Sequence, residues 1–234
     1  MEQKYILKNC NSFEPKHIFE CGQCFRWNPN EDGSYTGIFG NNVINVKKEQ
    51  NEIVFKGIAK GDIYKTCREY FDLEYNYERA KEKLSTTDID LKKSIDFGHG
   101  IRILNQDLWE TLISFIISAN NNIPRIKGII ERLSKEYGNE IIWNGKEYYT
   151  FPTPEELAIA SVSDLRRLGL GFRDARVYET TRRAKTGEID LKGLQEENDV
   201  NKLREKLLLI PRSWTQSGRL RNAVFPKQKE CFSC

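Results

Sequence analysis

Residues 23–57 alternate between apolar and polar positions, and strong turn sequences interrupt the alternation. The alternating segments are 23–27, 34–39, 43–46 and 52–55. The first two turns between them read Asn-Glu-Asp-Gly and Gly-Asn-Asn. A period of two that is broken by such turns is typical of antiparallel strands joined by hairpins. The pattern therefore predicts an antiparallel meander, with residues 21–27 at the start of its first strand.

The spacing of apolar residues becomes helical after residue 62. Ile63, Cys67, Tyr70 and Phe71 share one side of a helix predicted within residues 62–84, and the charged stretch up to Lys93 is interpreted as helix ends and a connector. The composition changes near residues 90–100, which indicates a domain boundary between residues 98 and 99.

Beyond residue 100 the apolar positions follow helical spacing throughout. Residues 106–118 are apolar on almost all sides, which predicts the central buried helix. The next helix, from Ile123, carries a single apolar stripe that includes Ile126, Ile130 and Leu133. Two further helices are predicted over residues 174–185 and 199–210.

Cap signals mark several helix ends. Thr153, Pro154 and Glu156 combine an N-cap, a proline at the first helical position and a capping-box glutamate, so a helix is predicted to start there. Ser163 is predicted to cap another short helix, which ends at the glycines of residues 168–171. These elements predict an α+β fold, in which a small antiparallel sheet with a helix precedes a bundle of short helices.

Composition narrows the possible functions only slightly. The chain has 234 residues, 38% hydrophobic and 30% charged, which is enough to bury a sizeable core. Lys and Arg outnumber Asp and Glu by 37 to 34, so the charge favours a nucleic-acid partner only weakly. The sequence shows no secretion signal or membrane-spanning run, so we expect a cytoplasmic protein (nucleoid-associated in a bacterium, nuclear in a eukaryote) with no membrane partner.

The cysteines leave two interpretations open. Two C-x-x-C pairs would supply the four thiolates of a zinc site, but the first pair lies at a predicted strand and the second at the extreme terminus. Reduced, packed thiols are the simpler interpretation, and an iron–sulphur cluster would need four grouped cysteines. We therefore expect no metal and no cofactor. The six cysteines are Cys10, Cys21, Cys24, Cys67, Cys231 and Cys234.

Three motifs stand out, each with a structural alternative. The asparagines of residues 120–122 follow an apolar helix and form either a functional turn or a helix corner in which one of them caps the next helix. Phe172 and Arg173 follow a glycine-rich helix stop; either Arg173 reaches a base edge, or it is solvated at a helix start that Asp174 favours. Gly22 either lets the backbone approach a ligand or marks a bulge.

Taken together, the motifs are more specific. Gly-Gln-x-Phe-Arg-Trp from Gly22, Asn-Gln-Asp followed by Ser-x-Asn-Asn-Asn-Ile-x-Arg-Ile near Asn120, and Leu-Gly-x-Gly-Phe-Arg up to Arg173 occur in a characteristic order and spacing. In these features the chain resembles the 8-oxoguanine DNA glycosylases, and the resemblance runs from about residue 5 to Pro211.

The resemblance implies a helix-hairpin-helix glycosylase of base-excision DNA repair, with N-glycosylase and apurinic-site lyase activities and no cofactor. It implies an N-terminal antiparallel sheet domain (TBP-like) over residues 1–98, packed on a helical glycosylase domain over residues 99–211, with DNA in the cleft between them. The expected partner is double-stranded DNA containing 8-oxoguanine opposite cytosine, with the damaged nucleotide flipped out of the stack. We expect a monomer.

The resemblance also assigns roles to five residues. Gly22 would offer its carbonyl to the N7 hydrogen that distinguishes 8-oxoguanine from guanine. Asn120 would fill the space left by the flipped base, and Phe172 would wedge into the stack. Arg125 and Arg173 would contact the cytosine left behind. Filling the gap and satisfying that cytosine offset the cost of unstacking.

The tail departs from the family. Family members continue after Leu-Ile-Pro with a hairpin of the type Gly-Val-Gly-Pro-Lys-Val-Ala-Asp-Cys, whose lysine attacks the sugar, and with an aspartate some twenty residues later. Here Gln216 stands at the lysine position and the chain stops before the aspartate. We therefore expect a truncated, inactive glycosylase domain followed by an out-of-family tail over residues 212–234.

Back-translation suggests the origin of the tail. The codons AGG AGT TGG ACC CAA AGT GGC CGA CTG encode residues 212–220, and without their first base they lead into Gly-Val-Gly-Pro-Lys-Val-Ala-Asp. The shifted frame continues to Ala-Phe-Pro-Val through the remaining residues. Because Trp214 has a single codon and many codon positions are fixed, we interpret the tail as the product of a frameshift, which makes the pair Cys231 and Cys234 incidental.

Two hypotheses remain, and the residue at position 216 distinguishes them. The first is an 8-oxoguanine glycosylase and lyase by descent, with an intact pocket and no catalytic residues in this translation. The second is a non-catalytic DNA-binding module that recognises lesions. The alkyladenine branch of the superfamily fits less well, because Gly22 and the asparagine triplet do not suit its open aromatic pocket.

Overall fold

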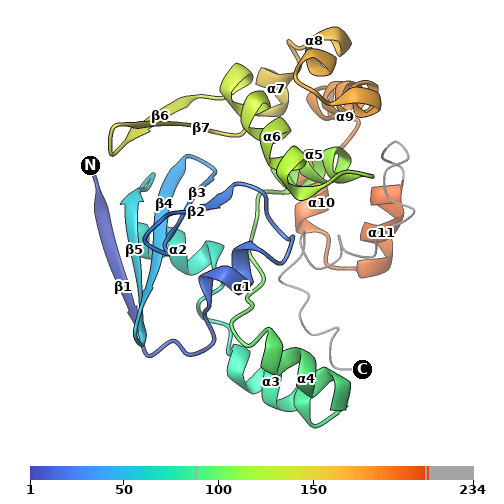
Figure 1. Cartoon of the computed structure of the whole chain (residues 1–234). Helices are drawn as coiled ribbons and strands as arrows, with labels where there is room; N and C mark the ends of the chain where they lie inside the picture. Colours follow the sequence, from blue (N-terminus) through green and yellow to red (C-terminus); the bar gives the residue numbers. More distant parts are fainter. Residues whose placement is uncertain (88, 209, 211–234) are drawn as a thin grey trace. The chain divides into compact units, whose positions relative to one another are not determined.

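Five antiparallel strands form the sheet of the N-terminal unit (Figure 1). Their spatial order is β1-β5-β4-β3-β2, so β2 to β5 form the predicted meander and β1 adds to its far edge beside β5. The strands are β1 (Gln3–Lys8), β2 (Trp27–Pro29), β3 (Tyr35–Phe39), β4 (Asn42–Glu49) and β5 (Glu52–Ile58). Four helices accompany them: α1 (Pro15–Phe19), α2 (Ile63–Tyr70), α3 (Tyr77–Ser85) and α4 (Ile89–Phe97).

The computed structural model describes residues 1–87, 89–208 and 210, which form two compact units. The first unit consists of Met1–Asn105 and Trp143–Gly145. The second consists of Gln106–Ile142 and the described residues from Lys146 onward.

Trp27 organises the core of the first unit. It is 1% exposed, and its indole stacks on Phe19 with ring centroids 4.0 Å apart. The indole Nε1 donates to the Tyr70 hydroxyl at 3.0 Å, which satisfies its buried polar atom. Trp27 pairs with Gly37 on β3, where an added Cβ would lie 2.2 Å from the indole. The absence of a side chain at Gly37 therefore creates the space for the tryptophan.

Two expectations for the first unit are wrong, and one of its strands was not predicted. Residues 21–26 are mostly bends and form no strand, and β2 begins only at Trp27. The charged stretch up to Lys93, which was interpreted as helix ends and a connector, instead continues into α4, a helix that buries none of its residues. The strand that was not predicted is β1, a half-buried edge strand whose partner in the described sheet is β5.

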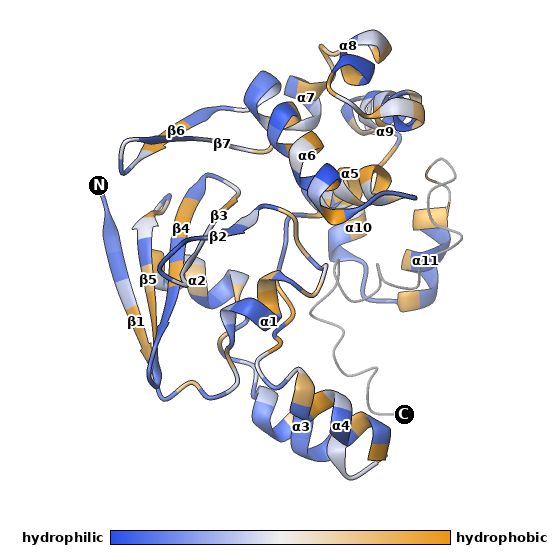
Figure 2. Cartoon of the chain, in the orientation of Figure 1, coloured by the Kyte–Doolittle hydropathy of each residue, from blue (hydrophilic) through white to orange (hydrophobic). Residues whose placement is uncertain are grey.

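The second unit is built around α5 (Leu108–Ser118), as predicted. Eight of its residues are buried, including Trp109, Leu112 and Ile116, and Asp107 caps its N-terminus. The apolar stripe of α6 (Ile123–Tyr137) is buried as predicted, at Ile126, Ile129, Ile130 and Leu133. In the colouring of Figure 2, α5 carries mostly hydrophobic positions, whereas α6 combines hydrophobic and hydrophilic ones.

The remaining helices of this unit agree with the predicted cap signals in part. Thr153 and Glu156 form the predicted capping box of α7 (Pro154–Leu157), and α9 spans Asp174–Lys185 as predicted. Ser161, not Ser163, caps α8 (Val162–Arg167), because Asp164 completes a second capping box with Ser161. The other helical elements are the 3-10 turn η1 (Gly171–Arg173), α10 (Leu191–Glu196), which was not predicted, and α11 (Val200–Leu208).

The expectation of purely helical structure after residue 100 is also wrong. β6 (Glu140–Trp143) and β7 (Lys146–Tyr149) form a two-stranded hairpin. Its turn is Asn144-Gly145, and both residues have positive φ, 50° and 69°. An Asn-Gly pair with positive φ at both positions is the strongest local hairpin signal. The α+β class is nevertheless confirmed, with the sheet first and the helices after it.

Candidate functional site

Gly22 lies in the bend between α1 and β2, and its backbone has a φ of 82°. An added Cβ would meet no atom within 4 Å, so the positive φ, and not crowding, favours glycine here.

The neighbouring residue holds this bend in place. The side-chain Nε2 of Gln23 donates to the carbonyl oxygens of Ile18 at 2.9 Å and Arg102 at 2.8 Å. Its Oε1 accepts a hydrogen bond from the Leu104 amide at 3.1 Å. The side chain of Gln23 thus holds the bend by hydrogen bonds to the backbone of three residues outside it. Gly22 was predicted as a site residue and Gln23 was not, although both belong to the same motif.

The three asparagines between α5 and α6 have three different structural roles. Asn120 has a φ of 50°, a left-handed conformation that asparagine tolerates better than most residues. The side chain of Asn121 donates to the Ile117 carbonyl at 3.1 Å, at the end of α5. Asn122 caps α6 by accepting from the Arg125 amide at 3.0 Å. The predicted cap of the following helix is confirmed, and the side chain of Asn120 remains exposed.

Arg173 is anchored to this asparagine turn. It is 2% exposed, and its Nε and Nη2 donate to the Ala119 carbonyl at 2.8 and 2.6 Å. Nη2 also donates to the Asn120 carbonyl at 2.7 Å, and Nη1 donates to the Leu170 carbonyl at 3.3 Å. The alternative in which Arg173 is simply solvated is therefore wrong. Its planar guanidinium joins the turn to the start of α9.

An aromatic side chain lies exposed beside this anchor. Phe172 is 59% exposed, and the guanidinium carbon of Arg173 lies 4.2 Å from its ring centroid. Two left-handed glycines precede Phe172: Gly169, with a φ of 95°, lies between α8 and η1, and Gly171, with a φ of 58°, is the first residue of η1. A large exposed aromatic side chain beside a cationic group is a feature of surfaces that insert into or stack on bases.

The local electrostatics are positive. Burial lowers the pKa of Arg173, and the nearby charges of Arg125 and Arg176 lower it further. Arg125 is exposed on the first turn of α6, and its backbone amide is held by Asn122. An anion at this place would relieve the repulsion among these guanidinium groups.

The structure thus brings together four of the predicted residues in the second unit: Asn120, Arg125, Phe172 and Arg173. Gly22 belongs to the first unit. Gln216 and the whole tail over residues 212–234 lie outside the described residues.

The described cysteines are free thiols. Cys24 and Cys67 are buried, and burial raises the pKa of the Cys67 thiol. Among the residues that the structure describes, no group of three or more His, Cys, Asp or Glu side chains is arranged to hold a metal ion. Cys231 and Cys234 of the zinc alternative lie outside them. No helix in the described part is long and apolar enough to cross a membrane.

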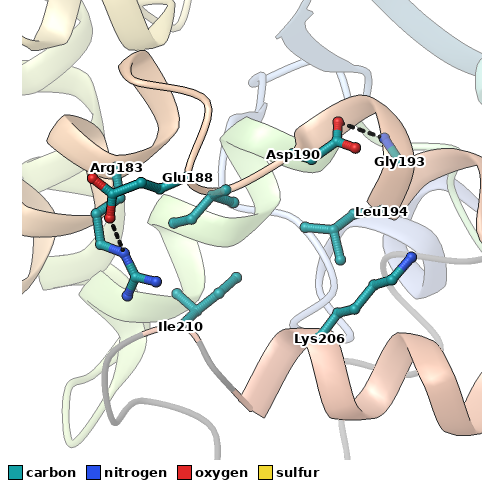
Figure 3. A pocket seen from close by; sticks show the side chains of 8 residues that line it. Arg183, Glu188, Asp190, Gly193, Leu194, Lys206 and Ile210 are labelled. Carbon is teal, nitrogen blue, oxygen red and sulfur yellow. Dashed lines mark hydrogen bonds and ion pairs between the residues drawn. The ribbon is translucent and has the colours of Figure 1, made fainter.

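A pocket of about 250 Å³ lies elsewhere in the second unit (Figure 3). It is lined by the apolar side chains of Ile189, Leu194 and Ile210 and by charged groups that have partners of their own. Arg183 pairs with Glu188 at 3.3 Å, and Asp190 accepts from the Gly193 amide at 2.8 Å. The described residues that line it include no aromatic side chain and none of Gly22, Asn120, Arg125, Phe172 and Arg173, so we do not assign it to base recognition.

Comparison with known proteins agrees with the motifs. A sequence model of the N-terminal domain of 8-oxoguanine DNA glycosylase matches residues 5–112. The N-glycosylase/DNA lyase of Saccharomyces cerevisiae is 34% identical over 182 residues, which cover 71% of this chain and 48% of the yeast protein. The chain spans about half the length of the curated relatives it matches.

Two solved structures are more similar. MBOgg1, in complex with a low-affinity DNA ligand, is 45% identical with a TM-score of 0.84, and the match covers 89% of this chain and 71% of that one. The Clostridium acetobutylicum 8-oxoguanine glycosylase/lyase, in complex with double-stranded DNA containing cytosine opposite 8-oxoguanine, is 41% identical with a TM-score of 0.85. That match covers 90% of this chain and 73% of the clostridial one.

The sheet unit, the helical unit and these relatives define the chain's class as that of the DNA N-glycosylase/lyases. Within that class, the chain belongs to the 8-oxoguanine DNA glycosylase family, as its three motifs predicted.

Proposed function

We propose that this chain recognises 8-oxoguanine opposite cytosine in double-stranded DNA by extruding the damaged nucleotide. The observation that carries the proposal is the anchored turn, in which buried Arg173 fixes the backbone of Asn120 beside exposed Phe172. A rigid turn that presents a polar side chain and an aromatic wedge is suited to opening a base step. The complex of the clostridial relative with DNA containing cytosine opposite 8-oxoguanine supports the choice of substrate.

Each residue would have a separate role. Asn120 would occupy the space left by the extruded nucleotide, and Phe172 would enter the neighbouring step. Arg125 is exposed and would donate to the acceptor edge of the unpaired cytosine. A guanidinium has five N–H donors, and the bonds of Arg173 to carbonyl groups use four, which leaves one Nη1 hydrogen for the same cytosine.

Gly22 would read the lesion itself. 8-Oxoguanine carries a hydrogen on N7, where guanine has a bare acceptor, so a carbonyl at this place attracts the lesion and repels the normal base. The Gly22 peptide suits this role because Gln23 fixes the bend on both sides. The discrimination would depend on where the Gly22 carbonyl points, and hence on the positive φ of that residue.

Excision in the family requires a lysine amine, which attacks the anomeric carbon, expels the base and forms a Schiff base with the sugar. Gln216 stands at that position in this chain. A glutamine amide is not basic and forms no Schiff base. We therefore propose that the chain, as written, binds the lesion without cutting it. The glycosylase and lyase activities belong to the product of the shifted reading frame.

The second candidate is a non-catalytic lesion-binding module that acts in its present form. Gln216 favours this candidate, because glutamine forms no Schiff base. The true reading frame of the gene distinguishes it from the glycosylase. The gene can be resequenced across the codons for residues 210–234. If this reveals one extra or missing base, the chain is a mistranslated glycosylase. If the tail is confirmed as written, the chain is the binding module. Either form would act where the genome lies.

Borohydride trapping on a duplex containing 8-oxoguanine opposite cytosine tests the proposal, with binding measured in parallel. Three proteins are compared: the chain as written, the frame-restored chain, and the frame-restored chain that keeps Gln216. We expect selective lesion binding by all three and a trapped adduct only with the second. An adduct with the chain as written would refute the assignment of Gln216. Equal affinity for duplexes with 8-oxoguanine and guanine would refute lesion recognition.

A further inference from the structure

Arg176 lies one helical turn beyond Phe172, in the first turn of α9. Its guanidinium carbon is 5.9 Å from the ring centroid of Phe172, so the aromatic ring has Arg173 at 4.2 Å and Arg176 somewhat farther away. The side chain of Arg176 is partly exposed. Within the described residues it makes no hydrogen bond or ion pair.

The other arginines of α8 and α9 differ from Arg176 in this respect. Arg166 pairs with Asp174 at 2.7 Å, Arg167 with Glu136 at 2.9 Å, and Arg182 with Glu179 at 3.0 Å. Arg183 pairs with Glu188 at 3.3 Å. Each of these four arginines is therefore paired with a carboxylate.

The guanidinium groups around the wedge instead repel one another. The charges of Arg125 and Arg176 both act on Arg173. The N–H donors of Arg173 point at backbone carbonyls. Those of Arg176 have no hydrogen-bond partner among the described residues. A fold that keeps unpaired like charges together tolerates a repulsion that an anion would relieve, and a guanidinium matches the geometry of a phosphate.

We infer that Arg176 binds a backbone phosphate of duplex DNA next to the base step that Phe172 enters. This inference rests on the proposed function and extends it to a residue outside the three motifs. Arg176 would hold the backbone in register while Phe172 opens the step. A phosphate contact fixes position and carries no sequence or lesion information. Arg176 should therefore contribute to affinity for every duplex, damaged or not.

The test is the salt dependence of binding by the full chain, measured with fluorescent duplexes that contain 8-oxoguanine or guanine opposite cytosine. Each phosphate contact contributes about 0.9 to the slope of log affinity against log salt concentration. We expect Arg176→Gln to reduce that slope by about 0.9 and to weaken both duplexes by the same factor. Arg176→Lys keeps the charge and should keep most of the slope.

Arg182→Gln is the matched control, because it removes the same charge from the same helix but from an arginine that Glu179 already neutralises. It should leave the slope unchanged. If the unmodified chain binds no duplex, the proposed function fails. If that chain binds the lesion selectively and Arg176→Gln does not alter the slope, only the role of Arg176 fails. Loss of lesion selectivity without a change of slope would mean a base contact and would also overturn the inference.

Thermal unfolding of the variants provides a folding check. Arg176 makes no hydrogen bond in the described structure, so Arg176→Gln should unfold near the temperature of the unmodified chain. If Arg176→Gln is misfolded, Arg176→Lys still tests the inference, because at matched charge the loss of the planar fork should weaken both duplexes equally. Binding by Arg176→Lys that matches the unmodified chain at every salt concentration would then count against a fork contact with phosphate.

Discussion

The guanidinium of Arg173 donates to the carbonyl oxygen of Asn120 at 2.7 Å, so a residue at the start of α9 sets the backbone of a turn 53 positions earlier in the chain. Asn120 has positive φ there, and its carbonyl and that of Ala119 accept hydrogen bonds from the same side chain. The main role of Arg173 is therefore to position the backbone of Ala119 and Asn120. Its contact with cytosine, as proposed, uses the donor that remains.

Arg173→Lys should loosen the turn. An ammonium group lacks the planar fork that serves two neighbouring carbonyls, so buried acceptors lose partners and the free energy of unfolding should fall by about 1–3 kcal/mol. Lesion affinity should fall as well. Urea denaturation and duplex binding measure the two effects. Arg182→Lys, at an exposed ion pair, should change stability by less than about 0.5 kcal/mol. Unaltered stability of Arg173→Lys would show that the carbonyl contacts do not hold the turn.

Asn120→Gly separates the side chain of Asn120 from its backbone conformation. Glycine adopts positive φ without strain, so the variant should keep the turn and stay within about 0.5 kcal/mol of the original stability. Without a side chain to fill the gap, affinity for the 8-oxoguanine duplex should fall by about tenfold, since extrusion costs a few kcal/mol. Isothermal titration with damaged duplex measures this loss.

Asn120→Ala is the companion variant, because it removes the same side-chain amide but strains the left-handed backbone. Both variants should lose lesion affinity, and only Asn120→Ala should lose stability. If Asn120→Gly binds as well as the original chain, Asn120 serves the turn alone.

Local signals in the sequence predicted much of the second unit. The capping box at Thr153 and Glu156 and the bounds of α9 follow from hydrogen bonds between residues close in sequence, which a local pattern can encode. The burial of α5 follows from its apolar composition on all sides. In the asparagine triplet, the cap by Asn122 was predicted as one alternative, because it is also a local interaction.

The features that were missed depend on distant partners or have weak patterns. β1 is an edge strand defined by its pairing with β5, about fifty residues later. The burial of Arg173 depends on carbonyls at residues 119 and 120, and the role of Gln23 depends on Arg102 and Leu104. Nothing near Arg173 or Gln23 in sequence indicates these bonds. The five site residues were selected through the family motifs, and their roles toward DNA stay predictions.

Gly22→Ala should weaken the preference for 8-oxoguanine over guanine. Alanine at a φ of 82° costs about 1–2 kcal/mol, and the bend can relieve that strain by turning the Gly22 carbonyl. Competition binding with the two duplexes measures selectivity. Gly33→Ala is a matched control, since Gly33 has a φ of 78° and equally open surroundings. It should lose similar stability but no selectivity. Unchanged selectivity of Gly22→Ala would count against the pocket assignment.

We expect His17 to make the stability of the first unit sensitive to mild acid. Its Nδ1 accepts a hydrogen bond from the Gly100 amide at 3.3 Å, which requires a neutral acceptor, and its ring lies 4.8 Å from that of His99. Burial lowers the pKa of His17, the charges of His99, Lys16 and Lys48 act in the same direction, and Glu14 opposes them. The unfolded chain therefore binds the proton more readily than the folded chain does.

By linkage, the stability contributed by neutral His17 is fully present above the unfolded-state pKa of about 6.5 and is lost as pH falls below it toward the lower pKa of the folded state. His17→Asn keeps an acceptor near the position of Nδ1 but does not titrate. Between about pH 7 and pH 5, the free energy of unfolding should therefore fall less steeply in His17→Asn than in the original chain. Urea denaturation across this range measures the difference between the two proteins, which removes the contributions of the carboxylates they share. Parallel pH profiles would show that the pKa of His17 is the same in the folded and unfolded chains, which would contradict the prediction.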